Sequence, residues 1–299
     1  MHETVAHGHR PVLLDDVVEL CAPLPGALVV DGTLGRGGHA AALLERGVRL
    51  VGLDRDPDAI AAVRARLGPE VELHQAPFSR IPELLGERRA DAVLLDLGVS
   101  SPQIDTASRG FSFRNDGPLD MRMDPTSGEP VSAWLEHVDD TELADVLFRL
   151  GEERQSRRIA RAILAARPIH TTGQLADIVA KTIGRGDGRI HPATRTFQAL
   201  RMVINDELGQ LDAALRAIPE LLAPGGRFVV IAFHSLEDRS VKQAFRTLAG
   251  EGGPVDFKGQ PLTSPRFRLV ERRARKGEER DPTNPRARSA RLRALERLP

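Results

Sequence analysis

The sequence predicts an α/β fold in which a doubly wound parallel sheet is interrupted by an all-helical insertion. Three observations predict it. Strand and helix patterns alternate up to residue 104, and the apolar run at residues 92–95 is continuous, as in strands that are buried on both faces. After Gln103 no strand pattern returns until residue 227, and helical periodicity takes over.

The expected elements follow in order along the chain. Strands are expected at residues 27–31, 48–54, 71–74 and 92–96, with helices between them at residues 39–46, 57–67 and 81–85. Pro57 suits a first helical position because Asp56, directly before it, can cap the helix.

The insertion is expected at residues 105–210, inside a sheet-forming domain of residues 1–104 and 211–299. Its helices are predicted at residues 141–150, 154–166 and 172–183, followed by one long helix from Pro192. Apolar residues recur at intervals of three and four positions over residues 197–218. This spacing indicates one long helix that carries the chain back to the sheet. The sheet then resumes at 227–232, a helix follows at 238–248, and residues 267–272 and 287–295 supply closing strands.

The composition, 41% hydrophobic and 28% charged, is that of an ordinary globular protein. No apolar run approaches a membrane span and no signal core begins the chain, so we expect a cytoplasmic protein without a membrane contact. The single cysteine, Cys21, excludes an internal disulfide framework and a cysteine-based zinc site. The zero net charge hides a basic end at residues 266–297, which an anionic partner and a solvated tail explain equally well.

A glycine-rich stretch at residues 31–39, Asp-Gly-Thr-Leu-Gly-Arg-Gly-Gly-His, connects the first strand to a helix. The carboxyl ends of parallel strands are where nucleotide-like ligands bind. The spacing is neither the G-x-G-x-x-G of dinucleotide sites nor the Gly-Lys-Ser/Thr of a phosphate loop. The carboxylate of Asp31 would repel a pyrophosphate. The stretch therefore favours a ligand with an adenosine end and a cationic end, such as S-adenosylmethionine.

Two further carboxylates end strands of the same expected sheet. Asp54 lies 23 positions after Asp31, a separation that suits hydrogen bonds to ribose hydroxyls, and Asp56 is better placed than Asp54 to cap the next helix. Asp96 ends the fourth strand, where it can accept a hydrogen bond from an ammonium group or a substrate amine; capping of the next turn is the alternative.

Two aromatic residues also follow strands. Phe78 comes after the third strand, where stacking on an adenine and filling of the core are equally good explanations. His234 comes after the fifth strand, where it can accept a proton, although a lone histidine is more often structural.

Long motifs along the whole chain resemble one family closely, the small-subunit ribosomal RNA cytosine-N4 methyltransferases (RsmH, formerly MraW). The motifs lie at residues 11–14, 31–39, 54–56, 96–103, 109–113, 117–123, 191–198, 233–239 and 284–289. The resemblance implies a Rossmann-like class I methyltransferase sheet and methylation of the N4 amine of cytidine 1402 in the 16S RNA of the small ribosomal subunit. It implies contacts to S-adenosylmethionine from Gly37, Gly38, His39, Asp54, Phe78, Asp96 and Gln103.

The catalytic residues follow less directly from the resemblance. The Asp/Asn/Ser-Pro-Pro-aromatic motif of many amino-methyltransferases is absent, and residues 101–104 match only its start. The cytosine amine needs an acceptor for its hydrogens, because its lone pair is delocalised into the ring. We expect Asp96 and His234 to supply that acceptor. No metal is expected, because the leaving sulfonium starts cationic and ends neutral.

Arg109, Phe111 and Arg195 are expected to bind the RNA substrate through stacking or phosphate contacts. For the arginine-rich residues 154–161, an RNA-binding face and a merely solvated helix face are equally good explanations. A homodimer is compatible with the sequence, which does not determine the oligomeric state.

Two other classes of protein explain less of the chain. A nicotinamide-dependent oxidoreductase would share Asp54 but should show G-x-G-x-x-G. A non-catalytic RNA-binding protein would explain the basic end but not a complete cofactor crevice.

Overall fold

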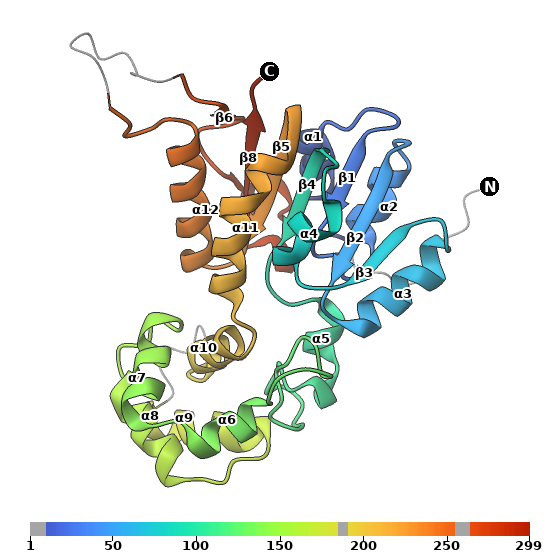
Figure 1. Ribbon diagram of the computed structural model, residues 1–299. Helices are drawn as coiled ribbons and strands as arrows, with labels where there is room; N and C mark the ends of the chain where they lie inside the picture. Colours follow the sequence, from blue (N-terminus) through green and yellow to red (C-terminus); the bar gives the residue numbers. More distant parts are fainter. Residues whose placement is uncertain (1–9, 185–190, 255–263) are drawn as a thin grey trace. The chain divides into compact units, whose positions relative to one another are not determined.

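The computed structural model describes residues 10–184, 191–254 and 264–299 (Figure 1). The chain divides into two compact units, a sheet unit of Met1–Gly98 with Gly209–Pro299 and a helical unit of Val99–Leu208. Among the described residues, no helix combines the length and the apolar character that crossing a membrane requires.

The sheet unit is built on one sheet whose strands follow the order β3-β2-β1-β4-β5-β8-β6. β1 to β5 run parallel, and β8 pairs antiparallel with β5, β6 and β7. The strands are β1 Leu28–Asp31, β2 Arg49–Asp54, β3 Glu72–Gln75, β4 Ala90–Asp96, β5 Leu222–Ala232, β6 Phe267–Leu269, β7 Arg275–Lys276 and β8 Arg291–Arg297.

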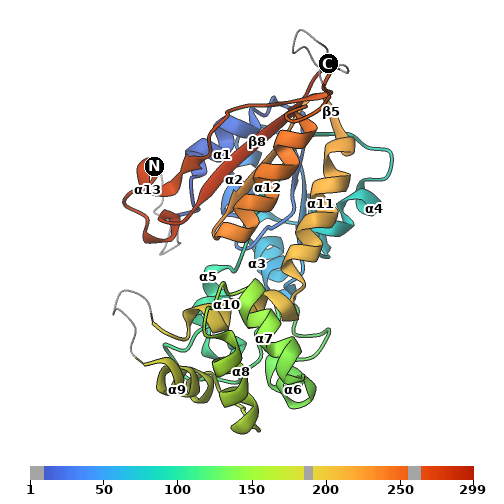
Figure 2. The same ribbon diagram turned by 90° about the vertical axis from the view of Figure 1, so that its left-hand side faces the viewer.

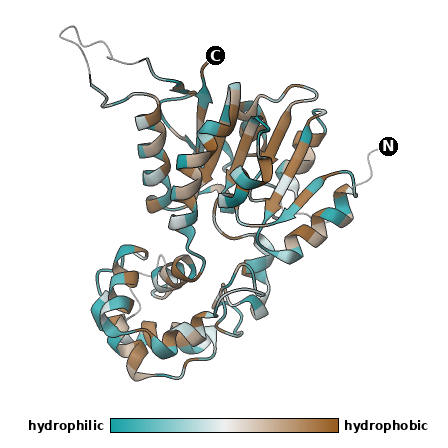
Figure 3. Cartoon of the chain, in the orientation of Figure 1, coloured by the Kyte–Doolittle hydropathy of each residue, from teal (hydrophilic) through white to brown (hydrophobic). Residues whose placement is uncertain are grey.

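Helices cover both faces of this sheet, and the strands are correspondingly apolar (Figures 2 and 3). Alternate residues of β4 point to opposite faces: Val93 and Leu95 pack in one core, Ala92 and Leu94 in the other. The first core includes α4 (Ile81–Leu85), α11 (Glu207–Leu221) and α12 (Ser235–Leu248). The second includes α1 (Leu14–Cys21), α2 (Gly38–Leu44) and α3 (Pro57–Leu67). A short helix, α13 (Gly277–Arg280), precedes β8.

This topology brings the ends of β1, β2 and β4 to one edge of the sheet. The strand order reverses between β1 and β4, the point at which open α/β sheets form a ligand crevice. Asp31, Asp54 and Asp96 are the last residues of their strands, and Phe233 and His234 follow β5 at the same edge. We call this the carboxyl edge.

The helical unit has a separate apolar core. Its helices are α5 Ser101–Asp105, α6 Val131–His137, α7 Asp140–Arg149, α8 Ser156–Ala165, α9 Thr172–Ile183 and α10 Thr194–Ile204. Asn205 is buried and connects the end of α10 to the segment that contains Met121 and Met123. Its side chain accepts a hydrogen bond from the Met123 amide and donates one to the Met121 carbonyl, both at 2.8 Å.

The predicted α/β fold class is confirmed, but the single long helix after Pro192 is wrong. The chain forms α10 and α11 with a break at Asn205 and Asp206, where Asp206 has φ +48°. The apolar spacing continues across this break, so periodicity alone could not reveal it. The sequence analysis also missed α1 and α6, and it placed the last strand earlier than β8.

Candidate functional site

Three carboxyl groups of the carboxyl edge are held in an environment that disfavours their negative charge. Burial raises the pKa of Asp31 to about 7 and that of Asp54 to about 6. Burial also raises the pKa of Asp96 well above its ordinary value, and the charges of Asp31 and Glu237 add to the effect. Among the described residues, neither Asp31 nor Asp54 has an ion-pair partner. The edge therefore holds acids that a cation would stabilise in their ionised form.

Asp54 organises the glycine-rich loop between β1 and α2. Its Oδ2 accepts the Gly35 amide at 2.8 Å, and its Oδ1 accepts the Asp56 amide at 2.9 Å. Asp56 caps α3 by accepting the Asp58 amide at 3.0 Å, as the sequence predicts. A carboxylate has about four lone-pair sites, so Asp54 keeps acceptor capacity for hydroxyl groups of a ligand.

The glycines of this loop serve two different purposes. A Cβ at Gly38 would lie 2.4 Å from Pro11 Cγ, so this position must stay small for the chain to pack against itself. At Gly35, with φ +51°, a Cβ would meet nothing nearer than 3.9 Å. Gly37 has φ +70° and lies against Val63 of α3. Backbone shape and packing thus explain Gly37 and Gly38 before any ligand is considered.

His39 and Asp96 form the most unusual pair at the edge. Nε2 of His39 lies 3.0 Å from the Val12 carbonyl, which can only accept, so the ring carries its proton there. Burial lowers the pKa of His39 to about 4, which leaves Nδ1 as a bare acceptor. Nδ1 lies 3.7 Å from Asp96 Oδ2, and the buried Oδ1 of Asp96 has no partner in the described part of the chain.

These atoms together define the chemistry that the edge accepts. When Asp96 is ionised, its Oδ2 and Nδ1 of His39 are acceptors that face each other without a donor between them, and its buried Oδ1 has no partner among the described residues. A buried acceptor without a partner is costly, and an ammonium or amine group would satisfy it. The backbone amide of Asp96 itself donates to the Thr33 hydroxyl at 2.6 Å, which fixes the start of the following loop.

Phe78 begins a short 3-10 turn after β3 and is half-buried against the core that contains α4. A Cβ at Gly32 would come within 3.1 Å of Phe78 Cβ, so the side chain starts directly beside the glycine-rich loop. This position is compatible with both explanations of Phe78, filling of the core and stacking on an adenine.

His234 has a structural role that the sequence did not reveal. Its Nδ1 accepts the Glu237 amide at 3.4 Å, and Glu237 Oε2 accepts the Phe233 amide at 2.9 Å, a reciprocal cap on α12. Nε2 of His234 is buried and makes no hydrogen bond within the described residues, although Glu237 Oε1 lies 2.9 Å away. Because Nδ1 accepts the amide, the neutral imidazole carries its proton on Nε2, which is therefore a donor beside the Glu237 carboxylate.

The remaining predicted site residues belong to the helical unit. Gln103 is buried, and its Oε1 accepts the Ser100 amide at 2.9 Å at the start of α5. Arg109 donates to the Arg122 and Met123 carbonyls at 3.2 and 2.8 Å, with its guanidinium 6.0 Å from the centre of the Phe111 ring. Arg195 is exposed on α10 and donates to the Glu152 carbonyl at 3.5 Å.

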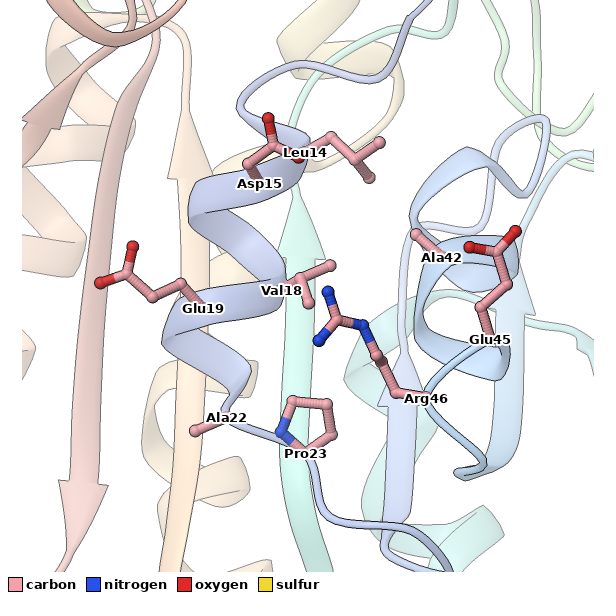
Figure 4. Close-up of a pocket in the computed structure, with 9 residues that line it drawn as sticks. All are labelled: Leu14, Asp15, Val18, Glu19, Ala22, Pro23, Ala42, Glu45 and Arg46. Atoms are coloured by element: carbon pink, nitrogen blue, oxygen red, sulfur yellow. The ribbon is translucent and has the colours of Figure 1, made fainter.

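A pocket of about 490 Å³ lies away from the chemistry just described, between α1 and α2 (Figure 4). Its walls carry Leu14, Val18 and Ala22 from α1 and the turn after it, and Ala42, Glu45 and Arg46 from α2 and the residues that follow it. It contains none of the strand-end acids, so we assign it no part in the candidate site.

Three residues that complete the carboxyl edge were not predicted from the sequence. Thr33 supports Asp96, Val12 fixes the tautomer of His39, and Pro11 packs on Gly38. Asp31 was used to argue against pyrophosphate but was not assigned to the site. The Asp-Gly-Thr spacing after a strand was the available signal for Thr33.

Comparison with known proteins gives consistent matches over nearly the whole chain. The model of the MraW methylase family matches residues 6–298. The chain is 50% identical over 308 aligned residues to the ribosomal RNA small subunit methyltransferase H of Thioalkalivibrio sulfidiphilus, covering 98% of each protein. It is 50% identical over 305 residues to the protein of that name from Gluconobacter oxydans, covering 98% of this chain and 94% of the relative. A crystal structure of an rRNA methylase from Streptococcus thermophilus is 12% identical, with a TM-score of 0.43 and coverage of 96% and 94%.

Proposed function

We propose, since this chain belongs to the MraW methylase family, that it methylates the exocyclic N4 amine of cytidine 1402 in the 16S RNA of the small ribosomal subunit. Family membership makes the chain an S-adenosylmethionine-dependent methyltransferase with a Rossmann-like sheet. The relatives' name supports a small-subunit ribosomal RNA as the substrate. The choice of cytidine 1402 as the methylated base and of N4 as the methylated atom is supported by the sequence motifs alone.

The observation that carries the proposal is the set of acceptor atoms without donors at the carboxyl edge. S-adenosylmethionine brings a sulfonium, an ammonium and two ribose hydroxyls, and these groups match acids whose pKa burial has raised. Asp54 has acceptor sites left for the ribose hydroxyls, and the glycine-rich loop lies open at Gly35. The residues present therefore fit this cofactor, which supplies an electrophilic methyl carbon when bound.

The chain itself orients the amine and receives its proton. Asp96 can accept a hydrogen bond from the cytosine N4 amine, which localises the nitrogen lone pair toward the methyl carbon. The amine loses one proton after the new N–C bond forms, and the Asp96 carboxylate takes it up. His234 is the second candidate acceptor; because its Nδ1 accepts the Glu237 amide, the neutral ring carries its proton on Nε2, so proton acceptance by His234 requires Nδ1 to leave that cap. Because methyl transfer is an in-line displacement, alignment of the reacting atoms is the main contribution of the site.

The target is tested by incubating the protein with isotope-labelled S-adenosylmethionine and 16S RNA or small subunits that lack the modification. Mass mapping of RNA fragments should place one label on N4 of cytidine 1402. Labelling of another base, or of a ring carbon or ribose oxygen, would contradict the proposal.

The catalytic assignment needs variants that separate proton acceptance from helix capping. Asn is a good N-cap, so His234→Asn keeps the cap of α12 and removes the imidazole, whereas His234→Ala removes both. A catalytic His234 requires single-turnover rates to fall in both variants, and a purely structural one requires His234→Asn to stay normal. Asp96→Asn should lower the single-turnover rate at saturating cofactor. Near-normal rates in Asp96→Asn and His234→Asn together would remove both residues from the mechanism.

A further inference from the structure

Four arginines close together in the helical unit have no carboxylate partner among the described residues. All four are exposed: Arg154 lies two residues before α8, and Arg157, Arg158 and Arg161 lie on α8. Within α8, Arg157, Arg158 and Arg161 lie on the exposed side, away from the buried Ile159 and Ile163, and Arg154 lies in the turn directly before the helix. We call these four residues the α8 arginine face.

The side-chain hydrogen bonds of this face within the described residues are local. Arg158 Nη1 lies 3.3 Å from Gln155 Oε1, and Arg161 Nε lies 3.3 Å from the Arg157 carbonyl. Acidic side chains are available on the helices packed against α8, such as the exposed Asp145 on α7 and Asp177 on α9, yet within the described residues none forms an ion pair with the face.

The basic carboxyl-terminal segment shows the opposite behaviour. Arg275 pairs with Asp16, Glu19 and Glu271, and Arg293 pairs with Asp238. Further pairs engage Arg266, Arg268, Lys276, Arg280 and Arg291. Much of the positive charge that the sequence places at this end is thus neutralised inside the sheet unit, whereas the α8 arginine face keeps its full charge.

The placement of the four arginines does not help α8 to fold. Arg157 and Arg158 lie in the first turn, where the helix dipole is positive, and that turn contains no acid. Arg157 and Arg161 are a like-charge pair four residues apart within α8, and such pairs destabilise a helix. A solvated face selected for stability would carry acids here.

An exposed aromatic ring lies close in the chain. Phe148, near the end of α7, is 59% exposed, and together with Leu24 it is one of two large apolar side chains exposed among the described residues. α7 and α8 pack against each other and are joined by a short connection (Figure 2). Arginines that contact phosphates, combined with an aromatic ring on which a base stacks, are the elements of a single-stranded nucleic-acid surface.

We propose that the α8 arginine face and Phe148 bind a single-stranded segment of the RNA substrate, the arginines through backbone phosphates and Phe148 through base stacking. This inference rests on the proposed function, because it takes RNA as the substrate. A membrane surface is a poorer match, because one exposed ring provides little apolar area for insertion.

The test compares two quadruple variants that lose the same charge. Arg154, Arg157, Arg158 and Arg161 are replaced by Gln in the first, and in the second, Gln replaces four exposed cations that have carboxylate partners: Arg80, Arg216, Arg266 and Lys276. RNA affinity is measured by fluorescence anisotropy from 50 to 200 mM salt with a single-stranded 16S segment around the target.

Four phosphate contacts on a single strand contribute about 2.8 to the slope of log affinity against log salt. We therefore expect the first variant to have a slope shallower by up to about 2.8, so that wild type loses about 50-fold more affinity over this fourfold rise in salt. The second variant should keep the wild-type slope. Equal slopes in wild type and the first variant, or equal losses in the two variants, would overturn the assignment.

Phe148→Ala tests the stacking element, with Leu24→Ala as its matched control on the other exposed apolar side chain. Loss of one stacked base should weaken binding roughly 5- to 150-fold without changing the salt slope. Unchanged affinity in Phe148→Ala, or an equal loss in Leu24→Ala, would reject the stacking element. Arginine-dependent binding to phosphatidylserine vesicles, with RNA affinity unaffected, would reject RNA as the occupant.

Two measurements separate failure of this inference from failure of the proposed function. Calorimetric S-adenosylmethionine binding should be equal in wild type and the first variant, and the melting temperature of that variant should be no lower than that of wild type. If wild type methylates 16S RNA and the first variant has the same KM for RNA, the surface assignment alone fails. If wild type transfers no methyl group to any RNA, the proposed function fails.

Discussion

Binding of S-adenosylmethionine should depend on pH, because the proposed site offers its cationic groups and ribose hydroxyls to acids that are partly protonated near neutrality. Burial raises the pKa of Asp54 to about 6 and that of Asp31 to about 7. A cationic ligand favours the ionised acids, so binding should release protons and tighten as pH rises. Over pH 5 to 7 the ammonium group of the ligand stays protonated, and His39, whose pKa burial lowers to about 4, stays neutral.

The size of the effect follows from the ionised fraction of Asp54. With a pKa of about 6, roughly one eleventh of the Asp54 carboxyls are ionised at pH 5 and roughly ten elevenths at pH 7. If the ligand binds only the ionised form, the apparent Kd at pH 5 is about tenfold weaker than at pH 7. Titration of Asp31 over the same range adds to this factor.

Isothermal titration calorimetry at pH 5, 6 and 7 measures the Kd, and repetition in two buffers of different ionisation enthalpy counts the released protons. Asp31→Asn serves as the matched variant, because it removes an acid that titrates in this range and a charge that raises the pKa of Asp96. Its Kd should vary less between pH 5 and 7 than that of wild type. A Kd constant within twofold over this range, or proton uptake on binding, would refute the reasoning.

Three further predictions concern stability. Gly38→Ala should destabilise the protein by about 1–3 kcal/mol in thermal unfolding, because the new Cβ would lie 2.4 Å from Pro11 Cγ; an unchanged melting temperature would show that Pro11 moves freely. Asp56→Ala should cost about 1 kcal/mol in urea unfolding through loss of the α3 cap, and a loss below a few tenths would contradict that role. Asp54 retains a proton in the folded protein that the unfolded chain has released. Ligand-free wild type should therefore lose stability relative to Asp54→Asn as pH rises from about 4 to about 6, by up to about 1.4 kcal/mol per unit; a pH-independent difference would mean that the pKa is not raised.

The carboxyl edge could be predicted because strand endings are local patterns. Apolar runs that stop at Asp31, Asp54 and Asp96 place these acids at one edge once the strands are parallel, and the sheet order puts β1 beside β4. The cap at Asp56 is equally local. The support of Asp96 by Thr33 is different, because this hydrogen bond joins residues 63 apart and exists only through the pairing of β1 with β4.

The break between α10 and α11 could not be predicted for a related reason. The apolar residues continue their helical spacing through Ile204, Leu208 and Leu211, as in an uninterrupted helix. Asn205 instead satisfies backbone groups of Met121 and Met123, more than 80 positions earlier. His234 illustrates a second limit, because a helix cap and a proton acceptor both belong directly after a strand, and the residue type suits either.

The zero net charge of the chain results from charges that are used in three different ways. Several carboxyl-terminal arginines are neutralised by distant acids, as in the pairing of Arg275 with Asp16, which lie 259 positions apart. Counting charges in a sequence window therefore overstates the basicity of that end. The acids of the carboxyl edge and the α8 arginine face have no such partners in the described part of the chain. Unpaired groups of one sign that are held together by the fold cost stability unless a ligand of the opposite sign binds them. By this criterion a cation stabilises the carboxyl edge and a polyanion stabilises the α8 arginine face. A sulfonium cofactor is such a cation, and an RNA substrate is such a polyanion.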